Sequence, residues 1–231
     1  MFLKHEVIFN KKLNEKFNLI RLKAKKRGFN FRPGQFITLK VTDLVFRCYS
    51  ISSSPDILPF WQIFVDITPG GPGTSYIRKL SKGDTIKTSL PTGEFIYKKD
   101  GSKNIILAGT GCGIAPLLPI LQTGLKDNRI NEILLLWGLR FKSDIVLESY
   151  LKQIAKKNTK FHYEIILSRP EEKWAGYTGH VQQYIVKNTK ILSPKKTSVY
   201  LSGNGEFIKD SLNALKGIEP APAQIYLEKC Y

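Results

Sequence analysis

The sequence has few of the residues that build metal or disulfide sites. Its 231 residues include three cysteines and three histidines. Cys48, Cys112 and Cys230 are an odd number with no C-x-x-C pair, which argues against a disulfide framework and an iron–sulfur cluster. The three histidines lack the spacing of metal ligands. We therefore expect no metal site and no structural disulfide.

Long apolar runs are also absent. The longest candidate, 105–121, is interrupted by glycines and prolines and is shorter than the ~18 residues of a membrane span. The N-terminal segment MFLKHEVIFN has a His–Glu pair where a signal peptide needs an apolar run. These features predict a soluble, cytoplasmic protein with no membrane span.

Acidic residues are scarce relative to basic ones. The chain has 36 Lys and Arg against 19 Asp and Glu, a formal net charge of +17 at pH 7. A field of this sign favours polyanions: nucleic acid, phosphate-rich cofactors or an acidic protein. The lysines are scattered in short groups, so solvated lysine faces and a dedicated docking surface both stay open. Nucleic-acid binding is a distant alternative, because no motif supports it.

The first half reads as a series of short strands separated by Pro, Gly and Asp turns. Its helical pattern is confined to Thr74–Leu80. Short strands at this density predict an N-terminal antiparallel β-barrel over residues 1–99. The expected strands are Glu6–Phe9, Phe17–Lys23, Gln35–Val41, Arg47–Ser53, Trp61–Ile67 and Thr85–Leu90.

From residue 103 onward, buried strands alternate with amphipathic helices. This alternation predicts a C-terminal α/β parallel-sheet, Rossmann-like nucleotide-binding domain over 103–231, and the protein should have two domains. The short polar segment 98–103 joins them. The expected strands are 104–108, 132–137, 161–167, 198–201 and 224–227. One expected helix follows the glycine turn and ends near Gly124, and three more cover 145–157, 181–186 and 206–215.

A glycine turn, Gly109-Thr110-Gly111-Cys112-Gly113, follows the first strand of the second half. Glycines let a diphosphate approach the backbone, and the helix after them presents free N–H groups. Pro116 suits a first helical turn. The spacing is G-x-G-x-G and not the usual dinucleotide fingerprint, so a tight turn without a ligand is the alternative.

A second candidate segment, Arg47-Cys48-Tyr49-Ser50, lies on an expected barrel strand. Alternate residues of a strand share a face, so Arg47 and Tyr49 should point together. A guanidinium can bind phosphate oxygens and a phenol ring can stack on a flat ring. An Arg–Tyr pair on a solvent-facing sheet would have the same sequence. Pro69–Ser75 opens the helix of this half and forms either a second phosphate cradle or a wide turn.

Taken together and in this order, these segments resemble the ferredoxin–NADP reductase superfamily, including its minimal flavin reductase and ferredoxin or flavodoxin reductase members. The resemblance covers nearly the whole chain. It implies an FAD-binding barrel followed by an NAD(P)-binding domain. Its further landmarks are Gly93-Glu94-Phe95, Trp137-Gly138-x-Arg140, Ser168-Arg169, Trp174-x-Gly176-x-Thr178-Gly179-x-Val181 and Tyr200-Leu201-Ser202-Gly203.

The resemblance implies a set of FAD contacts. Arg47 would hold the FAD pyrophosphate, Tyr49 would stack on the isoalloxazine, and Ser50 would hydrogen-bond near flavin N5. Further contacts are expected from Ser53, from Ile67 and Thr68 at the flavin edge, and from Gly71, Gly73 and Thr74 at the FAD phosphates.

The resemblance also implies an NAD(P) site at the glycine turn. Thr110 would lie closest to the path of the hydride from nicotinamide C4 to flavin N5, and Ser50 and Ser202 would border that path. The other expected contacts are Gly109, Gly111, Gly113, Ile114, Pro116, Arg140, Ser168, Arg169, Ser202 and Gly203.

Three positions depart from the family pattern. Ser202 stands where members often have a cysteine beside the nicotinamide. Arg169 matches a position that meets the 2′-phosphate in NADPH-using members, but the second basic position, near 177–180, is not clearly basic, so NADPH is favoured only weakly over NADH. Tyr231 as a lid that stacks on the flavin is a hypothesis, because the ending is one residue longer than the plant-type Glu-x-Tyr.

The expected function is therefore that of an FAD-dependent NAD(P)H oxidoreductase. It would pass electrons through the flavin to a carrier, and the charge of +17 would suit an acidic ferredoxin or flavodoxin. Two alternatives stay open. One is an NAD(P)H:flavin reductase that uses flavin as a diffusing substrate. The other is the reductase component of a monooxygenase, which is less favoured because no cysteine-rich ferredoxin segment is present.

Overall fold

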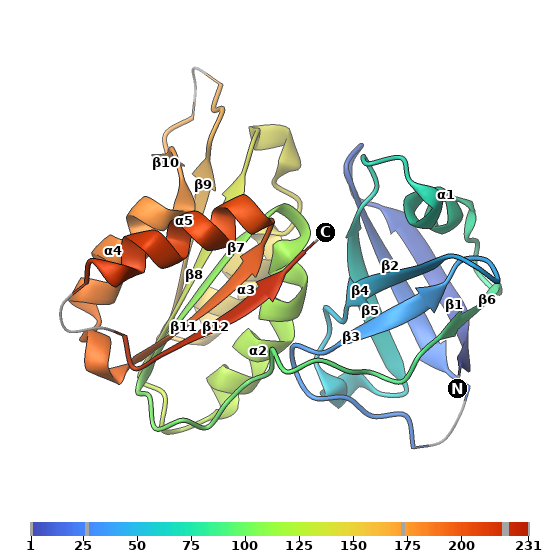
Figure 1. Ribbon diagram of the computed structural model, residues 1–231, viewed down its shortest axis with the longest axis horizontal. Helices are drawn as coiled ribbons and strands as arrows, with labels where there is room; N and C mark the ends of the chain where they lie inside the picture. The colour runs from blue at the N-terminus through green and yellow to red at the C-terminus, as the bar shows by residue number, and fades with distance from the viewer. Residues whose placement is uncertain (1, 26–27, 172–173, 219–221, 231) are drawn as a thin grey trace.

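The computed structural model describes residues 2–25, 28–171, 174–218 and 222–230, with the backbone alone at 190 and 191. It has two lobes, each built on a six-stranded sheet (Figure 1). The predicted two-domain architecture is confirmed, and the exact boundary between 99 and 103 stays a prediction. In the described residues, no helix is long and apolar enough to cross a membrane.

The first lobe is an antiparallel barrel with strand order β4-β3-β6-β1-β2-β5. A bridge between Ile51 and Ile63 brings the edge strands β4 and β5 together. Burial alternates along the strands, so one face of each strand packs into the barrel core and the other meets solvent. The elements are β1 (Leu3–Lys12), β2 (Phe17–Ala24), β3 (Phe36–Lys40), β4 (Phe46–Ser50), η1 (Pro55–Ile57), β5 (Phe60–Asp66), α1 (Pro72–Lys79) and β6 (Thr85–Thr88).

The second lobe is a parallel sheet with strand order β10-β9-β8-β7-β11-β12. Helices α2 and α3 pack on one face, and α4 and α5 pack on the other. Its strands are β7 (Asn104–Thr110), β8 (Glu132–Leu139), β9 (Phe161–Leu167), β10 (Tyr177–Thr178), β11 (Thr197–Gly203) and β12 (Gln224–Lys229). Its helices are η2 (Gly111–Gly113), α2 (Ile114–Lys126), η3 (Lys142–Asp144), α3 (Glu148–Lys157), α4 (Val181–Ile191), η4 (Pro194–Lys196) and α5 (Gly205–Lys216).

Four elements differ from the sequence prediction by three or more residues at an end. Strand β1 covers Leu3–Lys12, where Glu6–Phe9 was expected. The strand expected over Arg47–Ser53 ends at Ser50. Helix α3 begins at Glu148 and not at Ile145, because the chain before it forms the short turn η3, which the Asp144 carboxylate caps by accepting the Phe141 N–H. Helix α4 continues beyond Val186 to Ile191.

The two lobes share a buried apolar core. Phe17 and Phe64 of the barrel stack with ring centroids 4.8 Å apart, and they belong to the same cluster as Ile114 and Leu117 of α2. Burial of apolar side chains is the dominant favourable term in packing. The lobes are therefore held in a defined orientation before any polar contact between them is considered.

Candidate functional site between the lobes

The candidate site lies where the order of the parallel sheet reverses. Strand β7 neighbours both β8 and β11. From β8 the chain continues to β9 on one side of β7, and from β11 it continues to β12 on the other side. Ligands of open α/β sheets bind beyond the carboxyl ends of the strands at such a switch point. The strands end there at Thr110 and Gly203, and a cleft of about 660 Å³ opens beside them. We call this the interdomain cleft, because Lys16, Asp66 and Thr68 of the barrel also line it.

The glycine turn forms the floor of the cleft. Gly111 has a φ of +54°, a conformation that a residue with a side chain rarely adopts. The buried Trp137 fixes the turn by donating its indole N–H to the Gly111 carbonyl at 2.9 Å. A Cβ on Gly113 would overlap the Ser202 carbonyl oxygen, and one on Gly203 would overlap the Thr110 hydroxyl. Small residues therefore let the ends of β7 and β11 come together.

On the barrel, Arg47 and Tyr49 point together as predicted. Both pack against Gly73, where a Cβ would lie 2.8 Å from Arg47 Cγ and would overlap the Tyr49 hydroxyl. The Arg47 side chain is exposed and donates to the Phe46 carbonyl at 2.8 Å, and Tyr49 is half-buried. Burial raises the pKa of Tyr49 to about 12, so its phenol is neutral at physiological pH.

Helix α1 begins beside this pair. Its N-cap is Gly71, which has no side chain that could cap the helix, and Pro72 occupies the first turn. The Thr74 hydroxyl donates back to the Gly71 carbonyl at 2.9 Å. The helix N-terminus therefore presents backbone N–H groups next to a guanidinium and an aromatic ring. This donor set fits the diphosphate and the flat ring of FAD.

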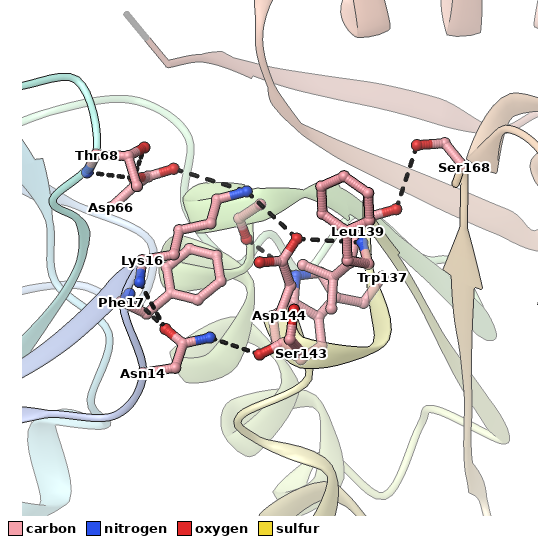
Figure 2. Close-up of polar contacts among 12 residues, drawn as sticks. Asn14, Lys16, Phe17, Asp66, Thr68, Trp137, Leu139, Ser143, Asp144 and Ser168 are labelled. Carbon is pink, nitrogen blue, oxygen red and sulfur yellow. Dashed lines mark hydrogen bonds and ion pairs between the residues drawn. The ribbon is translucent and has the colours of Figure 1, made fainter. Parts of the chain in front are cut away.

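The end of β5 carries the barrel side of the interdomain cleft. Figure 2 shows Asp66 with Thr68, whose backbone N–H and hydroxyl donate to Asp66 Oδ1 at 2.9 and 2.6 Å. Ile67 between them is buried and donates its N–H to the Lys16 carbonyl at 2.8 Å. Of the two predicted flavin-edge residues, Thr68 lines the cleft and Ile67 anchors the segment.

Two cysteines line the interdomain cleft, and Ser202 does not. Ser202 is fully buried, and its hydroxyl lies 3.7 Å from the Cys230 thiol. Cys112, within the glycine turn, and Cys230, just after β12, both line the cleft. Burial raises the pKa of Cys112 and raises that of Cys230 to about 12, so both thiols are neutral. Cys230 therefore lines the cleft, where the sequence predicted Ser202.

The remaining predicted residues fall into three groups. Thr110, Gly111, Arg140 and Ser168 line the interdomain cleft. Others are buried in structural roles: Ser53, whose hydroxyl accepts the Gln62 N–H, Gly113 and Ile114 at the start of α2, and Pro116 within it. Ser50 is half-buried at the end of β4, Gly109 packs against Leu117, Arg169 is exposed beside the cleft, and Tyr231 lies outside the described residues.

Sequence reasoning missed several residues of the interdomain cleft. Asn204 caps α5 by accepting the Phe207 N–H, and Glu206 and Asp210 follow it one turn apart on that helix. The sequence pattern that could have identified these residues is an N-cap asparagine directly after the glycine that ends a strand, followed by two acidic residues one helical turn apart. Lys16 carried no such signal, because only the tertiary fold brings the β1–β2 turn to the cleft.

Two protein-family models match the chain. The oxidoreductase FAD-binding domain matches residues 5–97, and the oxidoreductase NAD-binding domain matches residues 107–212. The first match covers the barrel with Arg47, Tyr49 and Gly73, and the second covers the glycine turn. FAD and a nicotinamide dinucleotide are therefore the cofactors of this chain.

Curated relatives point to the same chemistry. Ferredoxin–NADP reductase B of Sorangium cellulosum is 31% identical over 166 residues, which are 71% of this chain and 68% of that protein. The ferredoxin–NAD(P)(+) reductase component of the naphthalene 1,2-dioxygenase system of Pseudomonas putida is 27% identical over 206 residues, 89% of this chain and 62% of that protein. The chain thus spans about two thirds of the length of these relatives.

Solved structures share the fold over the whole chain. A ferredoxin NADP+ reductase from Neisseria gonorrhoeae with bound FAD and NADP has a TM-score of 0.85 at 22% identity, covering 100% of this chain and 99% of its own. A cytochrome P450 reductase from Amycolatopsis has a TM-score of 0.89 at 24% identity, covering 99% of this chain and 69% of its own. With the family models and the Sorangium relative, the conclusion is that this chain belongs to the ferredoxin–NADP reductase superfamily of flavin-dependent NAD(P)H oxidoreductases.

Proposed function

We propose that this chain takes electrons from NAD(P)H through FAD and passes them to a protein carrier, an acidic ferredoxin or flavodoxin. The observation that carries the proposal is that Arg47, Tyr49 and the start of α1 converge on the barrel, while the glycine turn faces the barrel across the interdomain cleft. Bound FAD would supply the chemistry, since it accepts a hydride from NAD(P)H and releases electrons one at a time.

The residues of the chain would bind and orient the two cofactors. Arg47 and the α1 backbone would hold the FAD diphosphate, Tyr49 would stack on its ring, and Ser50 and Thr68 would bound its edge. On the facing wall, Thr110 and the neutral Cys230 thiol would bound the nicotinamide. Neither role needs a general base.

The preference between NADPH and NADH is proposed from the charges near the cleft. Arg140 in the cleft and Arg169 beside it favour the 2′-phosphate of NADPH. Glu206 and Asp210 supply carboxylates that suit ribose hydroxyls and repel a phosphate. We therefore propose NADPH as the preferred donor with NADH also used. Location in the cytoplasm stays a prediction of the sequence.

The reductase component of an oxygenase is the second candidate. It is favoured by the similarity to the Pseudomonas dioxygenase reductase, of which this chain spans 62%. A flavin reductase with freely diffusing flavin would retain no FAD on purification. Reduction rates measured with purified ferredoxin, flavodoxin and free flavin separate these three activities.

Retention of FAD by an Arg47 variant tests the proposal at its central residue. Arg47→Ala should weaken FAD binding roughly 10- to 100-fold, because a charge-assisted bond to phosphate contributes about 1.5–3 kcal/mol. Flavin absorbance and fluorescence titration of the apoprotein measure this affinity.

The matched control is Arg129→Ala. Arg129 is half-exposed and pairs with Asp127 after α2, far along the chain from the barrel site. Its variant should bind FAD as the wild type does. Wild-type protein that binds no FAD and reduces no dye with NAD(P)H would overturn the function. Unchanged FAD affinity in Arg47→Ala would overturn only the assignment of Arg47.

A further inference from the structure

We infer that Lys16 is a positioning residue, which joins the flavin side of the interdomain cleft to its nicotinamide side and so sets the distance for hydride transfer. This inference rests on the proposed function. Lys16 lies in the turn between β1 and β2, and its side chain is 22% exposed. Figure 2 shows its ammonium between two carboxylates, 3.9 Å from Asp66 Oδ2 and 3.6 Å from Asp144 Oδ2.

On the flavin side, Lys16 holds the segment that ends β5 in two ways. Its backbone carbonyl accepts the Ile67 N–H at 2.8 Å, and its ammonium pairs with Asp66. Because Thr68 uses the other carboxylate oxygen of Asp66, both oxygens are engaged. Lys16 therefore fixes the segment 66–68, of which Asp66 and Thr68 line the cleft.

On the nicotinamide side, Lys16 reaches a nearly buried carboxylate of the other lobe. The Asp144 side chain is 8% exposed and caps η3 by accepting the Phe141 N–H at 3.2 Å. Phe141 directly follows Leu139 and Arg140, which line the cleft. A shift of Asp144 would therefore move the loop that carries these cleft residues.

The turn that carries Lys16 is itself fixed. Asn14 accepts the N–H groups of Lys16 and Phe17 and donates to the Ser143 carbonyl across the lobes at 2.7 Å. The ammonium also lies 5.2 Å from the centre of the Phe17 ring, which belongs to the core shared by the lobes. The cation is thus held in place from both lobes.

Removal of this cation has a defined electrostatic result. Two carboxylates from different lobes share one ammonium, and without it they would repel each other across the boundary between the lobes. Asp144 would also keep a dehydrated, uncompensated charge. The walls should then move apart, although the apolar core keeps the lobes attached.

Hydride transfer is sensitive to such a movement. The reacting atoms must approach to about 3–3.5 Å, and a misplacement of about 1 Å costs on the order of 100-fold in rate. A residue that sets the spacing of the walls therefore affects the rate of the chemical step more than the binding of either cofactor.

The test compares Lys16→Met, Lys16→Arg and Asp144→Asn in the full chain. Asparagine keeps an oxygen that can accept the Phe141 N–H but loses the charge. Anaerobic stopped-flow spectroscopy at saturating NADPH measures the limiting rate of flavin reduction and the charge-transfer absorbance of stacked flavin and nicotinamide. We expect Lys16→Met to lower the limiting rate roughly 10- to 100-fold and to weaken the charge-transfer absorbance, with FAD content unchanged.

The other variants make the test specific. Lys16→Arg should recover most of the rate, and Asp144→Asn should lower it in the same direction as Lys16→Met. The Lys16→Met/Asp144→Asn double variant should be no slower than the slower of the two single variants, because both substitutions remove the same Lys16–Asp144 ion pair. Lys126→Met is the matched control, since Lys126 of α2 also pairs across the lobes, with Asp56, but both side chains are more than half exposed. It should react at the wild-type rate.

Each outcome has a distinct meaning. If neither NADPH nor NADH reduces the flavin of the wild-type protein, the proposed function is overturned. A wild type that is reduced, with Lys16→Met reduced equally fast, overturns the role of Lys16 alone. If the Lys16→Met protein does not fold, the rate of flavin reduction in Asp144→Asn tests the inference instead. A wild-type rate in that variant overturns the inference.

Discussion

His5, at the scale of a single residue, is a titratable side chain that the barrel core keeps neutral. It is fully buried, and its Nδ1 accepts the Trp61 indole N–H at 3.3 Å. Its Nε2 lies 3.0 Å from the Thr88 hydroxyl, which itself donates to the Ser89 carbonyl, so Nε2 carries the proton. Both ring nitrogens are thus satisfied in the neutral form, and burial lowers the pKa of His5 to about 4.

This arrangement predicts a loss of stability in mild acid. The pKa of His5 is about 4 when folded and about 6.5 when unfolded, so below pH 6.5 the unfolded chain takes up the proton first. The free energy of unfolding should fall by up to about 3 kcal/mol as the pH drops from 7 to 4, and this contribution is then exhausted. Urea unfolding across this range measures the slope.

Two histidine variants separate this effect from general acid unfolding. His5→Gln should flatten the slope between pH 6.5 and 4, because no proton is taken up at that position. His162→Gln should keep it, since His162 is 62% exposed on the surface of β9. Equal slopes for His5→Gln and the wild type would show that another group controls the acid transition.

At the scale of elements, the contact between the glycine turn and the end of β11 shapes the nucleotide wall. Helix α2 starts directly after Gly113, so any shift of this glycine also displaces the helix N-terminus. Gly113→Ala should lower the free energy of unfolding by about 1–3 kcal/mol, because the new methyl group overlaps the Ser202 carbonyl oxygen. Chemical denaturation measures the loss.

The same variant should weaken binding of NADP+, which difference spectroscopy of the flavin can follow. The control is Gly217→Ala, at the end of α5, where an added Cβ would lie 3.8 Å from the Ala214 carbonyl oxygen and φ is −84°. That change should be neutral within about 0.5 kcal/mol. A Gly113→Ala protein as stable as the control would mean that β11 moves aside at no cost.

Hydrophobic periodicity and turn residues were sufficient to predict the elements and the two-lobe architecture. They were also sufficient to place Arg47 and Tyr49 on one face, because strand geometry is local. The start of α3 was missed because the local cap of η3, in which Asp144 accepts the Phe141 N–H, was not recognised in the sequence. Lys16 and Cys230 were missed for a different reason: each reaches the cleft from a segment distant in the chain.

At the scale of the whole molecule, the orientation of the lobes depends on the core that they share. Phe17, Phe64 and Phe95 of the barrel lobe belong to the same buried cluster as the apolar face of α2. This packing leaves the cleft as the polar part of the interface, where Lys16 and Asp66 lie and where Lys16 also pairs with Asp144. The apolar core therefore holds the lobes together, and the polar contacts adjust their spacing.

The net charge of the molecule predicts how it would meet the proposed carrier. A charge of +17 should speed encounters with an acidic protein, and steering of this kind raises association rates by about 10- to 1,000-fold. The Debye length falls from about 10 Å at 0.1 M salt to about 3 Å at 1 M, so the advantage should disappear as salt is added. We expect kcat/KM for an acidic ferredoxin or flavodoxin to fall at least about tenfold between roughly 0.05 and 0.5 M NaCl, with NADPH kept saturating.

A small neutral quinone provides the comparison for this measurement. It accepts electrons from the same cofactor but carries no charge, so its kcat/KM should change by less than about twofold over the same salt range. Because saturating NADPH removes the salt effect on nucleotide binding, the difference between the two acceptors reports the docking step alone. A parallel loss for both acceptors would place the salt effect inside the enzyme, and the excess of lysine would then have no part in recognising the carrier.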